Sequence, residues 1–135
     1  MEKAFILFMS GGLYFMIPLE HVVSVESRES AEAMELSVFD FGQACSLCDR
    51  PVRAPYILVM CFQEVKIGVA VEWVEGIKEI GKNDLYKLEA PVIGQDNQYL
   101  DSAVALKAMK PPLAYVLRMQ VLFEKLQKNS EAILE

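Results

Sequence analysis

The chain has 135 residues, of which 53% are hydrophobic and 24% charged, and its net charge is −6. A chain of this length and apolar content can bury a core, which excludes a disordered tail and a disulfide-stapled mini-protein. We expect a single domain over residues 1–135. The longest unbroken apolar run is Tyr56–Phe62, far short of the roughly 20 residues that a membrane-crossing helix needs, so we expect no direct membrane insertion.

The charge pattern and the cysteine count narrow the class of protein further. The 19 acidic residues outnumber the 13 Lys and Arg residues, and the basic residues are scattered singly, which argues against a nucleic-acid partner. The N-terminus has neither a basic leader nor a small-residue cleavage site, which predicts no signal peptide. The three cysteines are an odd number, and together with the absent leader they predict free thiols in the cytoplasm.

The first half of the chain alternates with a period of two, which is typical of β-strands. Residues 4–9 and 13–17 are apolar runs separated by Ser10, Gly11 and Gly12, and glycine reaches positive φ without steric cost, so this segment predicts a hairpin. The valines of residues 22–25 predict a third short strand, and residues 36–41 a further one.

The second half of the chain predicts another hairpin, more strands and one helix. Tyr56–Phe62 and Val65–Val71 flank a turn at Gln63 and Glu64, and the second run continues toward Ile77. Further strands are predicted at residues 99–106 and 113–117, and the only predicted helix covers residues 119–128. About ten short strands at steady spacing indicate an all-β barrel or sandwich, with the two hairpins as possible seeds of two half-units.

The residue types that carry catalysis do not form a recognisable site. His21 is the only histidine, and no nucleophile or orienting acid surrounds it in a known arrangement. Glu72 and Glu75 are three residues apart in a strand, so their carboxylates point to opposite faces. Trp73, the single tryptophan, is interpreted as a core residue or an interface anchor. We therefore expect a protein-binding β module that is not an enzyme and has no cofactor.

Cys45 and Cys48 form a Cys-x-x-Cys pair, for which two interpretations stay open. On one turn of helix the two thiolates would share a face and could hold a soft metal or exchange electrons. No second pair completes a zinc site, and the neighbouring elements are strands, which favours two ordinary packed side chains.

The order of the motifs resembles the CheW-like domain family, the coupling proteins of bacterial chemosensory arrays. Residues 5–25 resemble the opening strand, glycine turn and valine-rich segment, and residues 36–41 resemble the family's Asp strand, with Asp40 on that Asp. Residues 57–77 are similar to the hairpin that ends in Gly-x-x-Val-Asp-x-Val, and residues 99–126 to the closing strands and helix. The matching positions in that hairpin are Gly68, Val71, Glu72 and Val74.

The resemblance implies a fold and a function. The family fold consists of two SH3-like five-stranded β-barrel subdomains that share a hydrophobic core, with a C-terminal helix. Its members are adaptors that connect the regulatory domain of a histidine kinase to the cytoplasmic tips of chemoreceptors. The receptor contact is an apolar groove that grips a helical hairpin, which the resemblance places at Val22, Val25, Val38 and Phe39. Asp40 and Gly68 are the expected structural residues.

The chain also departs from the family pattern, and these departures leave a second interpretation open. Residues 28–35 are short and lack the family's Arg-Gly, Ser24 stands in place of a Glu, and Ser37 in place of a Pro. The alternative function is that of a divergent CheW-like protein, which binds a kinase or another signalling partner without coupling to receptors.

Overall fold

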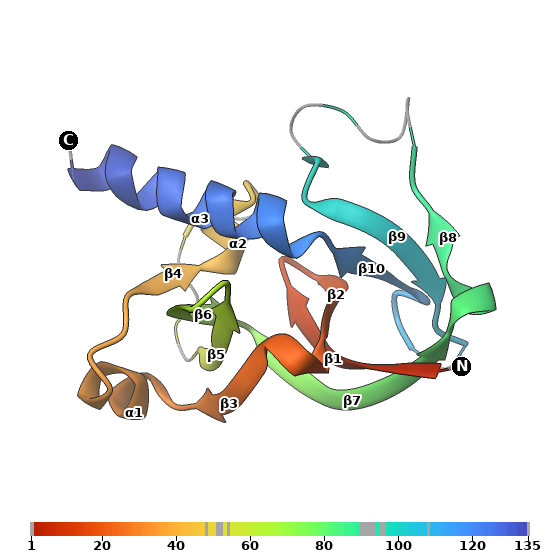
Figure 1. The fold of residues 1–135 in the computed structure, drawn as a ribbon, viewed down its shortest axis with the longest axis horizontal. Coiled ribbons are helices and arrows are strands. Elements are labelled where there is room, and N and C mark those ends of the chain that lie inside the picture. Colours follow the sequence, from red (N-terminus) through yellow and green to blue (C-terminus); the bar gives the residue numbers. More distant parts are fainter. Residues whose placement is uncertain are drawn as a thin grey trace.

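The structure is a computed structural model that describes residues 2–47, 49–50, 53, 55–89, 94, 97–107 and 109–134, with the side chains of the last helix described as far as Gln127. Strands β1 to β10 form two sheets, and helix α3 lies across them (Figure 1). None of the described helices is long and apolar enough to cross a membrane.

The larger sheet has six strands in the order β7-β1-β2-β10-β9-β8. The predicted first hairpin is confirmed, because β1 and β2 pair in an antiparallel register with Ile6 opposite Ile17, and Gly11 and Gly12 make the turn with φ of 60° and 78°. Strand β10 pairs in parallel with β2 and antiparallel with β9, and β8 pairs with β9 at the edge of the sheet. The strands are β1 Glu2–Ser10, β2 Leu13–Pro18, β7 Trp73–Gly81, β8 Tyr86–Lys87, β9 Leu100–Ala105 and β10 Leu113–Leu117.

The smaller sheet has four strands in the order β3-β5-β6-β4. It is built on the second predicted hairpin, in which Gln63 and Glu64 turn the chain with φ of 51° and 68°, a left-handed conformation that is uncommon outside glycine. The expected fold class is confirmed: the chain is mostly β, in two sheets, with a C-terminal helix. The expected division into five strands each differs from the observed sheets, which have six and four strands because β7 pairs with β1 of the first hairpin. The strands are β3 Val22–Glu26, β4 Val38–Asp40, β5 Tyr56–Phe62 and β6 Val65–Val71.

The helices differ from the prediction in number and length. Helix α3, Met119–Leu134, begins where predicted but extends past residue 128. The expectation of only one helix is wrong, since α1, Arg28–Ala33, and α2, Phe41–Ala44, are also present. Each short helix begins at a side-chain cap: the Ser27 hydroxyl accepts from the amide of Ser30, and the Asp40 carboxylate accepts from the amide of Gln43. The strand predicted at residues 36–41 therefore ends at Asp40.

One hydrophobic core joins the two sheets. Its largest members include three fully buried rings, Phe8 on β1, Phe15 on β2 and Phe41 on α2. The ring centroids are 5.7 Å apart for Phe8 and Phe15, 5.2 Å for Phe8 and Phe41, and 4.8 Å for Phe15 and Phe41. A second cluster lies within the six-stranded sheet, and a third lies between α1 and the outer face of the four-stranded sheet.

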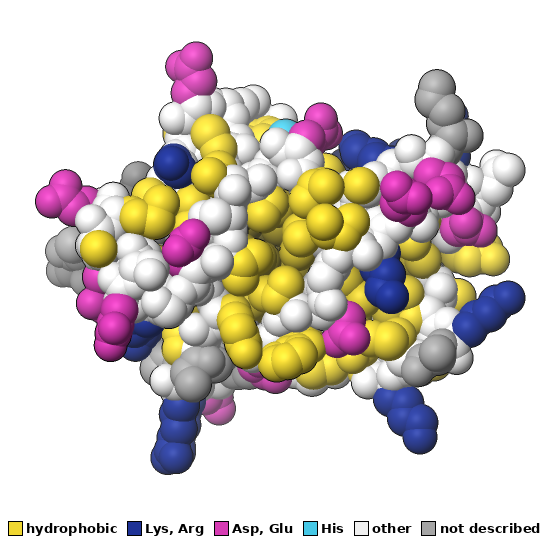
Figure 2. Space-filling model, turned by 90° about the horizontal axis from the view of Figure 1, so that it is seen from below, with side chains coloured by type: hydrophobic (Ala, Val, Ile, Leu, Met, Phe, Trp, Pro, Cys, Tyr) yellow, Lys and Arg dark blue, Asp and Glu magenta, His cyan; other side chains and the backbone are white. Residues whose placement is uncertain are grey.

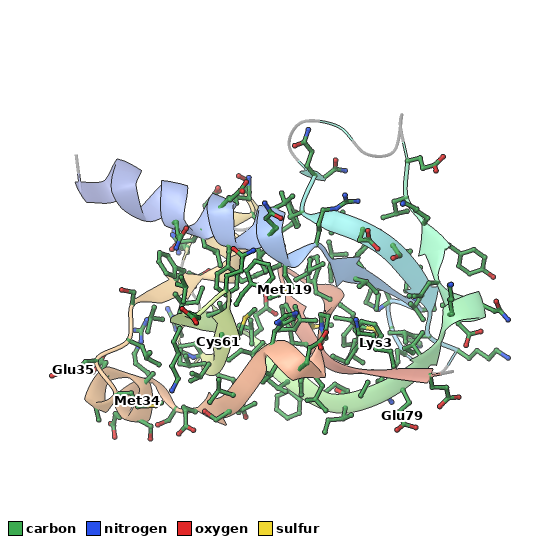
Figure 3. The ribbon with its side chains drawn as sticks, in the orientation of Figure 1. Lys3, Met34, Glu35, Cys61, Glu79 and Met119 are labelled. Atoms are coloured by element: carbon green, nitrogen blue, oxygen red, sulfur yellow. The ribbon has the colours of Figure 1, made fainter. Side chains whose placement is uncertain are left out.

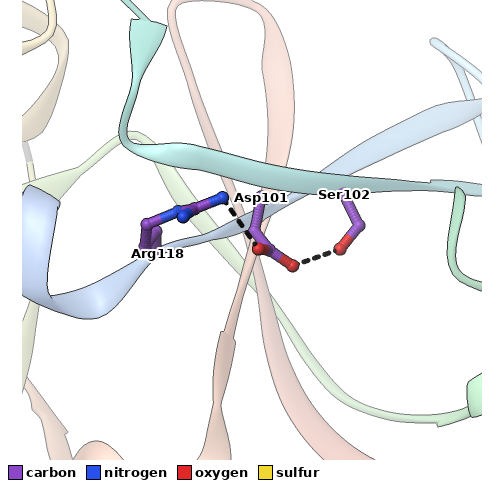
Figure 4. A network of polar contacts seen from close by, with 3 residues as sticks. All are labelled: Asp101, Ser102 and Arg118. Atoms are coloured by element: carbon purple, nitrogen blue, oxygen red, sulfur yellow. Dashed lines mark hydrogen bonds and ion pairs between the residues drawn. The ribbon is translucent and has the colours of Figure 1, made fainter. Parts of the chain in front are cut away.

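A small polar network fastens the start of α3 to the six-stranded sheet (Figure 4). The Asp101 carboxylate accepts from the Arg118 guanidinium at 3.1 Å and from the Ser102 hydroxyl at 2.6 Å. The amide of Arg118 also donates to the carbonyl of Tyr99 at 2.7 Å. The network fixes where α3 leaves β10, and α3 covers the shared core from there.

Gly68 on β6 offers a test of how closely the four-stranded sheet is packed. A Cβ atom at this position would lie 2.8 Å from Ile57 Cγ2 and 3.1 Å from Val38 Cγ2. We expect Gly68→Ala to lower the free energy of unfolding by about 1–3 kcal/mol in a urea titration, because overpacking forces buried side chains off their rotamers. Gly94→Ala is the control, because a Cβ atom there meets no atom of the described residues within 4 Å. Equal midpoints for Gly68→Ala and the wild type would contradict close packing here.

The two buried serines provide a matched pair for hydrogen bonding. Ser10 and Ser102 are 0% and 3% exposed, but among the described residues only Ser102 has a hydrogen-bond partner for its hydroxyl. We expect Ser10→Ala to raise the free energy of unfolding by about 1 kcal/mol, because a buried hydroxyl without a partner is costly. Ser102→Ala is expected to lower it by about 1 kcal/mol. Calorimetry of both variants checks the pair, and a destabilised Ser10→Ala would show that its hydroxyl is bonded.

Candidate docking surface

Exposed apolar side chains gather on one face, at the junction of the two sheets. We name this set the junction patch: Val25 is 41% exposed, Tyr56 40%, Trp73 49% and Ile77 59%. They come from β3, β5 and β7; strands β3 and β7 lie along the bottom of Figure 1, and β5 lies above β3 in that view. Figure 2, which views the molecule from that side, shows hydrophobic side chains across the middle of the face. Large exposed apolar residues that cluster in this way are typical of interaction sites.

An aromatic contact joins the two sheets within the junction patch. Tyr56 begins β5 of the small sheet and Trp73 begins β7 of the large sheet, and their rings meet at 5.5 Å and 87°. Between β6 and β7 the chain passes from one sheet to the other through a single residue, Glu72. Its amide donates to the Met9 carbonyl at 3.0 Å, and its carboxylate accepts from the Gly11 amide at 2.6 Å. These bonds fix the position from which Trp73 projects.

Strand register relates the other two patch residues to the shared core. Val25 lies opposite Leu58, so its side chain is on the same side of the sheet as Leu58 and as Tyr56, two residues before Leu58 on β5. Ile77 lies opposite Ile6, a member of the shared core. Val25 and Ile77 therefore lie at the solvent-exposed border of the core between the sheets.

The residues predicted for a receptor groove do not all lie together. Val22 and Val25 are on β3, whereas Val38 and Phe39 are on β4, and these strands are the two edges of the small sheet. Three strand spacings separate them, which is about 14 Å. Val38 packs against the cluster under α1, and Val22 and Phe39 pack against the shared core. Only Val25 belongs to the junction patch, and the assignment of all four valine and phenylalanine positions to a receptor groove stays a prediction.

Tyr56, Trp73 and Ile77 were not predicted as members of such a groove. Trp73 was interpreted as a core residue or an interface anchor, and at 49% exposure it is not in the core. A sequence signal was present, because Trp73 and Ile77 alternate at a period of two with the acidic residues Glu75 and Glu79, and these four are the exposed positions of β7 in the structure. An apolar side chain on the solvent side of a strand indicates a partner or a covering element.

The predicted structural residues have clear surroundings. Asp40 caps α2 through Gln43, at 3.0 Å. Gly68 donates its amide hydrogen to the Ser37 carbonyl at 2.9 Å, and this bond helps to hold the parallel pairing of β4 with β6. A structural role for both residues stays a prediction, and the Gly68→Ala experiment addresses one of them.

The single histidine lies at the surface beside β1. The ring of His21 contacts the Phe62 ring at 5.3 Å, and its Nε2 atom is 3.8 Å from Glu20 Oε1. Lys3 Nζ is 3.5 Å from the same carboxylate, next to a shallow open hollow of about 340 Å³. Lys3 lies near the start of β1 and is labelled in Figure 3. These contacts place the Lys3–Glu20 ion pair beside the His21 ring.

A metal or thiol site receives no support from the described part of the chain. The described residues include no group of three or more His, Cys, Asp or Glu side chains that could hold a metal ion. Cys48 lies outside the described residues, so the Cys45–Cys48 pair itself is not seen. Cys45 is buried, and burial raises the pKa of its thiol from 9.0 to about 12, while Lys125 and a hydrogen bond with Tyr99 lower this pKa by less.

We expect Cys45 to be an unreactive thiol. In a variant with Cys48→Ser and Cys61→Ser, iodoacetamide should alkylate folded Cys45 at pH 8 on the order of 1000-fold more slowly than the urea-unfolded chain, because the thiolate is the nucleophile. Mass spectrometry follows the alkylation. Similar alkylation rates of Cys45 in the folded and unfolded chains would contradict the raised pKa and favour a reactive thiol.

The pKa of Cys45 is higher in the folded chain than in the unfolded chain. The free energy of unfolding should therefore decline as pH rises from 9.0 toward about 12.

The fold is similar to the crystal structure of the scaffolding protein TtCheW from Thermoanaerobacter tengcongensis, with a TM-score of 0.71 over 92% of this chain and 94% of that chain. The two sequences are 15% identical. No family model and no curated protein matches the sequence. The fold implied by the family resemblance is therefore confirmed, and this chain has the fold of a CheW scaffold.

Proposed function

We propose that this protein is a non-catalytic cytoplasmic adaptor of bacterial chemotaxis, which binds the regulatory domain of a histidine kinase and the cytoplasmic tip of a chemoreceptor. The observation that carries the proposal is the junction patch, an exposed apolar surface at the meeting of two sheets in a scaffold-protein fold. Apolar side chains with 40% to 59% exposure are suited to burial under a partner.

The junction patch has the properties of a site for a helical receptor tip. Val25, Trp73 and Ile77 come from two strands of different sheets, so together they line a surface that an apolar helix face can cover. The Tyr56–Trp73 contact and the two bonds of Glu72 hold this surface in shape before a partner arrives. A preformed surface loses less entropy on binding.

Signal transfer in this proposal is mechanical. The kinase domain binds a different face, and both partners are held in a fixed relation by one shared core. A displacement of the receptor then changes the contacts that the kinase makes in its active and inactive states, which shifts the equilibrium between them.

A second candidate function omits the receptor and keeps a kinase or another signalling partner. Residues 28–35, which lack the family's Arg-Gly, contain helix α1 in this structure. Ala31 of α1 is buried against Ile57 and Ala70 on the outer face of the small sheet. Glu29, Glu32 and Glu35 are exposed, and Figure 3 shows Met34 and Glu35 at the outer end of this helix. The altered segment would present a different surface to a partner.

The exposed valines provide a matched test of the adaptor proposal. Val25 in the junction patch and Val65 at the β5–β6 turn are 41% and 37% exposed. Val65 lies at the opposite end of the hairpin from Tyr56, about 20 Å away. We expect Val25→Glu to weaken binding of a receptor-tip fragment at least ~10-fold by calorimetry, because a buried carboxylate without a partner opposes docking. Val65→Glu should leave this affinity unchanged, and both variants should still bind the kinase domain.

The outcomes separate the two candidate functions. Wild-type binding of the kinase domain without the receptor fragment would favour the second candidate. No binding of either partner at tens of micromolar would overturn both. Equal losses from Val25→Glu and Val65→Glu would remove the junction patch from the proposal and leave the adaptor role standing.

A further inference from the structure

One corner of the junction patch combines two aromatic rings with a carboxylate. The rings of Tyr56 and Trp73 stand nearly perpendicular, at 87°, and both are exposed to solvent. Trp73 Nε1 donates a hydrogen bond to Glu75 Oε2 at 2.8 Å, which holds the carboxylate beside the indole ring. We name these three residues the aromatic corner.

The aromatic corner has the electrostatic character of a cation site. The face of an aromatic ring carries partial negative charge, most strongly in tryptophan, and attracts a cation within about 6 Å. The Glu75 carboxylate adds a full negative charge at the edge of the indole, and one of its oxygens stays available after the bond to Nε1. In this edge-to-face pair one ring face is covered by the edge of the other ring, so an approaching cation meets the remaining aromatic face and the carboxylate beside it.

None of the cations in the described part of the chain occupies this corner. The cation–π contacts there are Lys3 over the Phe5 ring, at 5.9 Å, and Lys125 over the Tyr99 ring, at 5.8 Å. Likewise, the ion pairs among the described residues involve Glu20 and Asp101, and not Glu75. A cation that completes the corner would therefore come from outside the described part of the chain, and a binding partner is one such source.

We infer that the aromatic corner binds the guanidinium group of an arginine on the partner that docks on the junction patch. The inference rests on the proposed function, because it assumes a protein partner at this patch. Arginine fits better than lysine, since its planar group stacks on an aromatic face while its edge donates hydrogen bonds to a carboxylate. The net charge of −6 also favours approach of a basic segment. The partner is thus an apolar helix face bordered by arginine.

The single tryptophan makes this site directly observable. Trp73 is the only tryptophan of the chain, so its indole N–H gives one assignable signal in a ¹H–¹⁵N spectrum. We would titrate the full chain with N-acetyl-arginine amide, and with the citrulline analogue, which has the same shape without the charge. We expect a saturable shift of the indole signal by the arginine probe, with Kd on the order of 10 mM, and no saturable shift by citrulline.

Three variants assign the effect to the corner. Glu75→Gln should weaken arginine binding about 10-fold and Tyr56→Leu about 3-fold, through loss of the carboxylate and of one ring. Glu79→Gln is the matched control, because Glu79 is also exposed on β7 and lies about 13 Å further along the strand. Figure 3 shows Glu79 on the distal part of this strand. The control should bind arginine as the wild type does.

Other results overturn the inference. Equal shifts with arginine and citrulline, or equal weakening by Glu75→Gln and Glu79→Gln, would show that charge recognition does not occur at the corner. If the receptor fragment binds but the arginine probe does not, the corner assignment fails and the adaptor proposal stands. If the probe binds but neither protein partner does, the corner is a cation site and the proposed function fails.

Discussion

The contact among Phe8, Phe15 and Phe41 is the interaction on which the rest of the structure depends. Phe8 and Phe15 come from the first hairpin of the large sheet, whereas Phe41 opens the helix that follows β4 of the small sheet. Buried aromatic rings contribute large apolar areas and prefer offset-stacked or edge-to-face geometry, which fixes orientation as well as distance. The two sheets therefore share one core, and every surface at their junction takes its shape from that packing.

Local patterns made the hairpins and the start of α3 predictable from sequence. Alternating apolar residues and a two-residue turn define each hairpin within a short stretch, and Met119 begins a helical spacing of apolar residues. Helices α1 and α2 were missed because they have six and four residues, too few for a periodic pattern, and each begins at one capping side chain. The division of strands into six and four depends on parallel pairings between distant segments, β2 with β10 and β4 with β6, which local sequence does not specify.

The candidate site was less predictable, because exposure of an apolar strand residue depends on what covers it. Val25 and Phe39 look alike in sequence, as apolar residues of short strands, but β3 leaves Val25 exposed while Phe39 packs against the shared core. Trp73 illustrates the same difficulty. It was interpreted as a core residue or an interface anchor, and its exposure in the structure shows that this side of β7 faces solvent.

The passage from the small sheet to the large one constrains how an adaptor of the proposed kind could transmit a signal. Glu72 is the only residue between β6 and β7, and both its amide and its carboxylate are bonded to the end of the first hairpin. A hinge needs residues whose backbone angles are free to change, and a single residue held at two points by the large sheet is a poor one. The shared core opposes relative motion as well, because close-packed interiors deform little. Displacement of a partner on the junction patch would therefore move the molecule as one body, and the coupling would depend on where the two partners sit on that body.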